Sequence, residues 1–240
     1  MKNAGNPVIL PVADGTSLSA YVARPSGSGP FPGLIVFQEA FGVNQHIRDV
    51  ADSFAAEGYL AVAPELFHRT APAGFTCDYK DFPLVRQHLS AVTEVGLEHD
   101  VNAVWAWLHR QPQLRPNAVA CIGYCLGGRA AFLANSVKPF SAAVSYYGGG
   151  IAPDMLKRAP AQHGPLLFFW GGLDKHIPPE RIAQTIQALH AANKPHMNVE
   201  ISYADHGFFC DERASFHPQA AREAWALTLA FLREKLSTTP

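Results

Sequence analysis

Short apolar runs alternate along the chain with longer segments in which apolar residues recur every three or four positions. The short runs have the length of strands, and those at residues 34–37 and 166–170 are apolar throughout. Continuously apolar strands are typical of parallel sheets that are covered on both faces. We therefore expect eight strands, at residues 8–12, 18–23, 34–37, 60–63, 119–122, 142–147, 166–170 and 199–203.

The longer segments predict helices with one apolar face each. Gly58 ends a helix that is predicted from residue 47, and another helix follows Pro178 and Pro179. The helical period is clearest for Val101, Val104, Trp105 and Leu108, and again for Trp225, Leu229, Leu232 and Leu236. This alternation predicts an α/β fold, with a mainly parallel eight-stranded sheet and helices on both faces.

Two loops depart from the alternation. Asp14-Gly15 is a tight-turn signal, so we expect the first two strands to form an antiparallel hairpin. Residues 65–83 are rich in Pro, Gly and Thr, and we expect a long irregular loop there, of the kind that often serves function. Neither a repeat nor a low-complexity linker interrupts the chain, so we expect a single domain over residues 1–240.

Composition excludes several classes of protein. Hydrophobic residues make up 48% of the chain and charged residues 16%, well below the roughly 25% that is average, which indicates a large buried core. The formal net charge is -1, so there is no basic excess for nucleic-acid binding. No apolar run is long enough to span a membrane, and residues 1–11 favour a strand over a signal peptide. We expect a cytoplasmic protein, either a monomer or a homodimer.

Cysteine and histidine usage argues against a disulfide framework and against a metal centre. The four cysteines, at positions 77, 121, 125 and 210, include no Cys-x-x-Cys pair. Each is therefore either a buried apolar residue or a working thiol, and Cys121, inside a predicted strand, is expected to be structural. The 11 histidines are scattered and show no His-Glu-x-x-His spacing, so we expect no metal site.

The strongest local motif is Gly123-Tyr124-Cys125-Leu126-Gly127, between a predicted strand and a predicted helix. This is the pattern of a nucleophile elbow, with Cys in place of Ser. So sharp a turn requires glycines beside the nucleophile, and the N-terminus of a helix favours a thiolate. Cys125 is therefore the candidate nucleophile. The alternative is a glycine-rich turn that holds a buried cysteine.

A cysteine nucleophile needs a base, and the base needs an orienting acid. Asp174 follows the strand at 166–170, and His206 follows the strand at 199–203. The chain order nucleophile, acid, histidine is typical of such elbows, and ligands of open α/β sheets bind where strands end. We expect Cys125, Asp174 and His206 to form a catalytic triad. His176 is a weaker alternative as the base, because choosing it would leave nothing after the last strand.

The segment after the strand at 34–37 reads Gln-Glu-Ala-Phe-Gly-Val-Asn. In an elbow-type site, a backbone N–H from this loop and that of the residue after the nucleophile form the oxyanion hole. We therefore expect the N–H groups of Ala40 and Leu126 to bind the oxyanion. Glu39 is unexpected beside such a site, because its charge opposes that of the transition state, and the alternative is a solvated loop residue.

Taken together, the motifs resemble those of the dienelactone hydrolase family. They are Gln-Glu-x-Phe-Gly-Val-Asn, Gly-Tyr-Cys-Leu-Gly-Gly, Tyr-Tyr-Gly, Gly-x-x-Asp-x-x-x-Pro and Asp-His-Gly-Phe, in the family's order over nearly the whole chain. The resemblance implies an α/β-hydrolase fold and a carboxymethylenebutenolidase-like hydrolase that cleaves lactones or activated esters through a cysteine acyl-enzyme. It also implies that neither a metal nor an organic cofactor takes part.

The resemblance also suggests roles for other residues. In the family, the glutamate beside the oxyanion hole is coupled to the thiol and helps to deprotonate it when an anionic substrate binds, which matches Glu39. Family members that hydrolyse dienelactone bind its carboxylate with arginines, one of them a few residues after the catalytic histidine, where this chain has Cys210. Dienelactone itself is therefore in doubt as the substrate. The candidates for substrate binding are His68, Arg69, Arg86, Tyr147, Phe208 and Arg213.

Three alternative functions stay open at this stage. The first is a broader carboxylesterase or thioesterase that uses the same site. The second is a thiol redox protein in which Cys210 resolves an oxidised Cys125, although a redox thiol has no need of the acid and the histidine. The third is a silent ligand-binding module, which predicts a broken triad.

Overall fold

The computed structural model describes residues 6–237, so residues 1–5 of the predicted N-terminal strand segment lie outside the described residues. The described chain divides into two compact units, one up to Ala120 and one from Cys121 onward. The strand β5 (Leu114–Tyr124) contributes residues to both units. The single domain over residues 1–240 stays a prediction.

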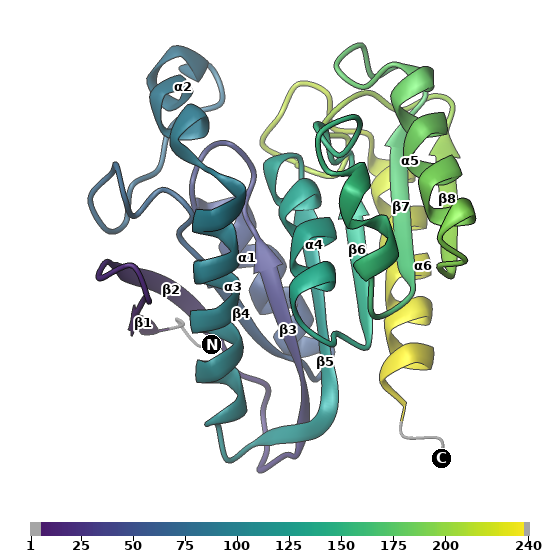
Figure 1. Ribbon diagram of the computed structural model, residues 1–240. Coiled ribbons are helices and arrows are strands. Elements are labelled where there is room, and N and C mark those ends of the chain that lie inside the picture. The colour runs from purple at the N-terminus through teal and green to yellow at the C-terminus, as the bar shows by residue number, and fades with distance from the viewer. Residues whose placement is uncertain (1–5, 238–240) are drawn as a thin grey trace. The chain divides into compact units, whose positions relative to one another are not determined.

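All eight predicted strands are present, in one eight-stranded sheet that is mostly parallel, with antiparallel strands at the N-terminal edge. Their order across the sheet is β1-β2-β4-β3-β5-β6-β7-β8 (Figure 1). Their bounds are β1 Asn6–Pro11, β2 Ser17–Ala23, β3 Phe31–Phe37, β4 Leu60–Pro64, β5 Leu114–Tyr124, β6 Ala142–Tyr146, β7 Leu166–Gly171 and β8 His196–Ile201.

The helices are α1 Gln45–Ala56, α2 Phe82–Ala91, α3 Glu94–His109, α4 Leu126–Val137, α5 Pro179–Ala191 and α6 Pro218–Leu236, with a 3-10 helix η1 at Leu156–Ala161. None of the helices within residues 6–237 is long and apolar enough to cross a membrane.

In the first unit, the predicted hairpin is formed by β1 and β2, which pair antiparallel, with Leu10 opposite Leu18. Gly15, in the turn, has φ +84°, which glycine adopts without strain. β3 and β4 pair in parallel, and β4 is buried along its whole length. Helix α3 lies in front of these strands and α1 behind them (Figure 1), so the apolar strands are covered on both faces.

In the second unit, β6, β7 and β8 pair in parallel. All residues of β6 and β7 are buried. Helix α4 packs on β6 and on η1, and α6 packs on β6 and β7. The hydroxyl groups of Tyr146 and Thr228 lie 2.7 Å apart and join β6 to α6.

The structure corrects several predicted boundaries. β8 ends at Ile201 rather than at Tyr203, and β6 ends before Tyr147. Helix α2 begins at Phe82, inside the stretch predicted to be irregular. Only Val85 and His88 of this ten-residue helix are buried. A helix this short is marginal on its own, so its stability comes from tertiary packing.

Candidate active site

Cys125 occupies a sharp turn between β5 and α4. Its φ of 54° and ψ of -112° lie outside the populated regions for a residue with a side chain. Its N–H donates to the carbonyl of Tyr146 at 3.0 Å, and its own carbonyl accepts from the N–H of Gly128 at 3.0 Å. Such strain costs about 1–3 kcal/mol and persists only where the surroundings enforce it. The turn therefore has the geometry of a nucleophile elbow.

Glycines make this turn possible because backbone atoms approach each other too closely for a side chain to fit between them. A Cβ on Gly123 would lie 1.9 Å from the carbonyl oxygen of Gly127, and a Cβ on Gly128 would lie 2.7 Å from the Cα of Gly148. Contacts this short are excluded, so the motif's glycines are steric requirements of the fold. The half-exposed Cys125 comes directly before α4, whose first N–H groups lack intrahelical partners.

His206 and Asp174 are paired beside this turn in the second unit. Nδ1 of His206 lies 2.7 Å from Oδ2 of Asp174, and both side chains are buried. Burial would lower the pKa of His206, but hydrogen bonds with the Asp174 carboxylate and the Cys125 side chain raise it to about 10. Burial would raise the pKa of Asp174, and its bond with His206 lowers it instead. The structure thus brings Cys125, His206 and Asp174 together.

His176, the alternative base, contacts the same carboxylate in another way. Its backbone N–H donates to Oδ1 of Asp174 at 2.7 Å, whereas its exposed ring lies 5.3 Å from the ring of His206. The geometry therefore favours His206 as the partner of Asp174. Sequence reasoning missed the backbone bond, for which only the Asp-x-His spacing offers a signal. His176 also lines a cavity of about 130 Å³ together with Gly148, Gly150, Ile151, Ala152, Trp170, Ile177, Pro178, Arg181 and Thr185.

Tyr147 and Phe208, both candidates for substrate binding, are completely buried. The ring of Tyr147 lies 5.0 Å from that of His206, and the ring of Phe208 lies 5.4 Å from that of Tyr147. Tyr147 also has a positive φ of 38°. Tyr147 therefore packs against the His206 ring, and Phe208 packs in turn against Tyr147.

The arginine candidates differ sharply in their surroundings. The Arg213 guanidinium lies against Gly207, the residue after His206, where an added Cβ would meet its Cζ at 2.5 Å. Arg86 is exposed on α2. Among the arginine candidates, Arg213 thus lies against the residue that follows His206, in the same unit.

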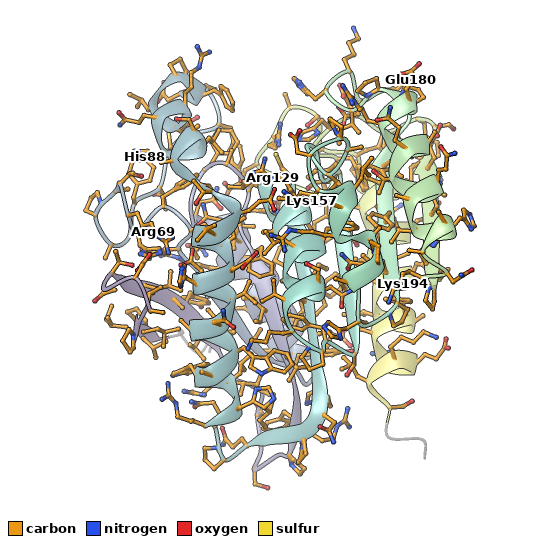
Figure 2. All side chains as sticks on the ribbon, viewed as in Figure 1. Arg69, His88, Arg129, Lys157, Glu180 and Lys194 are labelled. Carbon is orange, nitrogen blue, oxygen red and sulfur yellow. The ribbon has the colours of Figure 1, made fainter. Side chains whose placement is uncertain are left out.

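Arg69, which Figure 2 labels, forms ion pairs with two carboxylates of the first unit. Its guanidinium forms ion pairs with Asp14 at 2.7 Å and with the buried Asp100 at 2.8 Å. His68 also bonds to Asp100, at 3.0 Å. A buried carboxylate requires such partners, so these contacts indicate a structural role for Arg69 and His68.

Glu39 and Ala40 lie directly after β3, and both are buried, with Glu39 0% exposed. The alternative in which Glu39 is a solvated loop residue therefore does not hold. Its backbone carbonyl accepts from the side-chain amide of Gln38 at 3.2 Å. A buried carboxyl group is costly unless it is compensated or serves a function. Leu126 is the first residue of α4, so its N–H points from the N-terminus of that helix.

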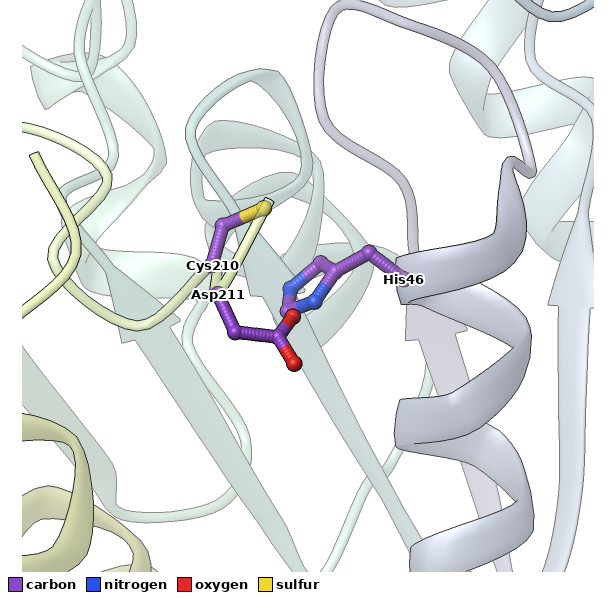
Figure 3. A group of neighbouring side chains, drawn as sticks. All are labelled: His46, Cys210 and Asp211. Carbon is purple, nitrogen blue, oxygen red and sulfur yellow. The ribbon is translucent and has the colours of Figure 1, made fainter. Parts of the chain in front are cut away.

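Cys121 and Cys210 are more deeply buried than Cys125, whereas Cys77 is partly exposed as Cys125 is. Cys121 is completely buried, with Sγ 3.6 Å from the carbonyl oxygen of Ala131, and burial raises the pKa of its thiol well above the usual value. The buried Cys210 and the exposed Asp211 are consecutive in the loop after β8 (Figure 3). We assign no metal to these residues, and the absence of a metal site stays a prediction. Figure 3 also shows His46, which lies in the first turn of α1.

Several known proteins resemble this chain over most of its length. The sequence pattern of the dienelactone hydrolase family matches residues 18–236. A protein of Synechocystis sp., provisionally named carboxymethylenebutenolidase, is 36% identical over 87% of this chain and 88% of its own length. A protein of Escherichia coli K12 with the same provisional name is 35% identical over 92% of this chain and 84% of its own.

A solved structure from Klebsiella pneumoniae, provisionally described as a dienelactone hydrolase, superimposes with a TM-score of 0.87 and is 33% identical. It covers 96% of this chain and 98% of its own. The fold is that of the α/β-hydrolases. The match over almost the whole chain, together with the elbow, the histidine and the acid in their expected order, shows that this chain belongs to the dienelactone hydrolase family.

Proposed function

We propose that this family member hydrolyses lactones or activated esters through an acyl-enzyme on Cys125. The Cys125 thiol first transfers its proton to the carboxylate of Glu39. The thiolate sulfur then attacks the carbonyl carbon, and the carbonyl oxygen becomes an oxyanion that accepts hydrogen bonds from the N–H groups of Leu126 and Ala40. The C–O bond of the leaving group breaks, and His206 donates a proton to the departing oxygen. Water then attacks the thioester carbonyl while His206 takes a proton from it, and the C–S bond breaks. The thiolate of Cys125 leaves and recovers its proton from Glu39, and a carboxylic acid is released.

The observation that carries this proposal is the continuous connection from Asp174 through His206 to the strained residue Cys125. With Nδ1 held by the carboxylate 2.7 Å away, the other ring nitrogen is available to the sulfur and to the leaving group. The raised pKa of His206, about 10, supports a protonated ring at neutral pH, which suits a general acid. Tyr147 packs against the His206 ring and limits its rotation.

Glu39 is the second acid that we propose to take part. Its complete burial at the end of β3 supports a functional carboxyl group over a solvated one. In this proposal, an anionic substrate shifts Glu39 toward the thiol, which transfers its proton to the carboxylate and becomes the nucleophile.

The substrate class that we propose is a lactone or ester, with a carboxylate group as an option. Arg213, against Gly207, supports binding of an anionic group near His206. Cys210 stands where lactone-cleaving relatives of this type have arginine, and it is buried, which supports a broader esterase activity as the second candidate. The redox alternative gains no support, because a resolving thiol must be reachable and Cys210 has no exposed surface.

The test is turnover of a panel of lactones and chromogenic esters, with and without a carboxylate, by the wild type and Cys125→Ala. We expect Cys125→Ala to lose several orders of magnitude in kcat/KM, and mass spectrometry of the quenched wild type to find the acyl group on Cys125. Acylation of another residue would refute the assignment.

Glu39→Gln tests the second acid in the same assay. If Glu39 acts as proposed, the variant binds substrate normally and loses turnover of the carboxylate-bearing lactone. Rates within about a factor of two of the wild type on every substrate, under roughly 0.5 kcal/mol, would contradict a catalytic Glu39. A large loss on neutral esters as well would keep Glu39 catalytic and remove the case for an anionic substrate.

A further inference from the structure

The turn between β3 and α1, residues 38–44, is tied to the long loop that precedes α2. The N–H of Cys77 donates to the carbonyl of Phe41 at 3.1 Å, and Gly42 and Thr76 form an isolated antiparallel bridge. Gly42 has φ +83°, and a Cβ there would lie 2.2 Å from the carbonyl oxygen of Phe75. The backbone of the loop is therefore in direct contact with the turn that contains Glu39 and Ala40.

Asn44 and Tyr79 form the side-chain part of this connection. Nδ2 of Asn44 donates to the hydroxyl oxygen of Tyr79 at 2.7 Å. Oδ1 of Asn44 accepts from the N–H of Ile47 and thereby caps α1. The ring of Tyr79 also packs on Phe41, with the ring centroids 4.5 Å apart. One tyrosine thus contacts both the middle and the end of the turn.

The loop that carries Tyr79 is itself held in place by contacts with α2. His88 of α2 (Figure 2) bonds to the Thr70 hydroxyl at 2.8 Å, and its ring lies 4.7 Å from that of Phe75. Val85 of α2 shares a buried cluster with Ala40 and Phe41, and Tyr79 packs against this cluster. Ala40, the proposed oxyanion donor, therefore belongs to the cluster that α2 and the loop enclose.

We propose that Tyr79 is a positioning residue for the oxyanion hole. It fixes the backbone of residues 38–44 through Asn44 and Phe41, and with it the direction of the Ala40 N–H. This inference rests on the proposed function, in which that N–H stabilises the oxyanion. A donor that points away from the developing charge loses most of its effect, because such bonds act only when they are preorganised.

The expected effect follows from the value of one donor. Removing an oxyanion donor outright costs about 10²–10³-fold in kcat. Tyr79→Phe keeps the ring on Phe41 and removes only the hydroxyl group that holds Asn44, so the turn loosens without losing the donor. We expect kcat to fall about 5–30-fold, with KM within about twofold of the wild type, since the ground-state carbonyl depends less on the hole than the transition state does.

The experiment compares three measurements on the wild type and Tyr79→Phe. They are kcat and KM on a neutral chromogenic ester, inhibition by a trifluoromethyl ketone, and the rate at which iodoacetamide alkylates Cys125. The ketone adduct places an oxyanion in the hole, so its inhibition constant should rise by the same factor by which kcat falls. Alkylation forms no oxyanion, so its rate should stay unchanged, whereas a general loss of structure would change it as well.

Two further variants complete the design. Tyr21→Phe is the matched control, because the Tyr21 hydroxyl donates to Asp52 at 2.8 Å in the same unit, and we expect wild-type kinetics from it. Asn44→Ser keeps an N-cap acceptor but is too short to reach Tyr79. It should lose as much kcat as Tyr79→Phe does, and the double variant should lose no more than either single variant. Asn44→Ser also provides the test if Tyr79→Phe does not fold.

The outcomes distinguish a failure of the Tyr79 inference from a failure of the proposed function. If turnover depends on Cys125 but stays within twofold of the wild type in both Tyr79→Phe and Asn44→Ser, the inference alone is overturned. So would a fall in the alkylation rate equal to the fall in kcat, or additive losses in the double variant. Turnover that survives Cys125→Ala would overturn the proposed function, and the inference with it.

Discussion

Asp174→Asn is an informative substitution because the structure dictates how the new amide must lie. The carboxylate has two partners, the N–H of His176 at Oδ1 and Nδ1 of His206 at Oδ2, each at 2.7 Å. A backbone N–H can only donate, so the amide oxygen of asparagine must stay toward His176. The NH2 group then faces His206, whose Nδ1 must accept.

This orientation places the imidazole in the wrong tautomer. With Nδ1 accepting, the ring proton lies on Nε2, and the ring can no longer take a proton from the water that hydrolyses the thioester. The same change in a serine protease triad costs about 10⁴-fold in kcat. A thiol is more acidic than a serine hydroxyl and depends less on its base, so we expect a loss of about 10²–10³-fold here, or about 3–4 kcal/mol.

The assay is kcat on a chromogenic ester near pH 7, with folding followed by urea denaturation. Asp205→Asn is the matched control, because Asp205 is exposed and accepts only the backbone N–H of His206 at 2.6 Å, a bond that an amide oxygen can still accept. We expect Asp205→Asn to stay within about twofold of the wild type. A folded Asp174→Asn variant with activity within threefold of the wild type would refute the tautomer argument, as would equal losses in the two variants.

Three further predictions follow from the geometry. Iodoacetamide should alkylate the half-exposed Cys125 well before the buried Cys121 and Cys210, as read by peptide mass spectrometry, and equal rates would contradict an activated thiol. The pKa of His206 is raised from 6.5 to about 10, so the stability from its protonated form is complete below about pH 6.5 and is lost as the pH rises toward 10. Between about pH 6.5 and 9.5, urea unfolding should therefore show a larger loss of stability for the wild type than for His206→Gln, and parallel losses would count against the shift. Gly42→Ala should destabilise the protein by about 2–4 kcal/mol, because its Cβ meets the Phe75 carbonyl oxygen at 2.2 Å. Gly58→Ala has a similar φ and nothing within 4 Å, so it should cost only about 1 kcal/mol in urea unfolding, and equal losses would show that strain at φ, not the close contact, dominates.

The sequence alone determined the strands and the elbow, because local patterns carry that information. Apolar runs such as those of β3 and β7 predict buried parallel strands wherever they occur. The glycines around Cys125 could be interpreted from the sequence for the same reason. The turn is so tight that the backbone of Gly127 leaves no space for a Cβ at Gly123. The order of nucleophile, acid and histidine then pointed to the pairing of His206 with Asp174, which lie 32 positions apart.

Only the tertiary structure decided which polar residues are buried and which partners they meet. Burial of Glu39 depends on neighbours that no short pattern specifies, and Arg69, a reasonable substrate ligand by position, is engaged with Asp14 and Asp100. Helix α2 has only ten residues, too few to be stable in isolation, so it forms through its tertiary packing. The contact between Asn44 and Tyr79 spans 35 positions and an irregular loop. Contacts of this kind depend on the complete path of the chain, whereas hydrophobic periodicity reports only on the nearest few residues.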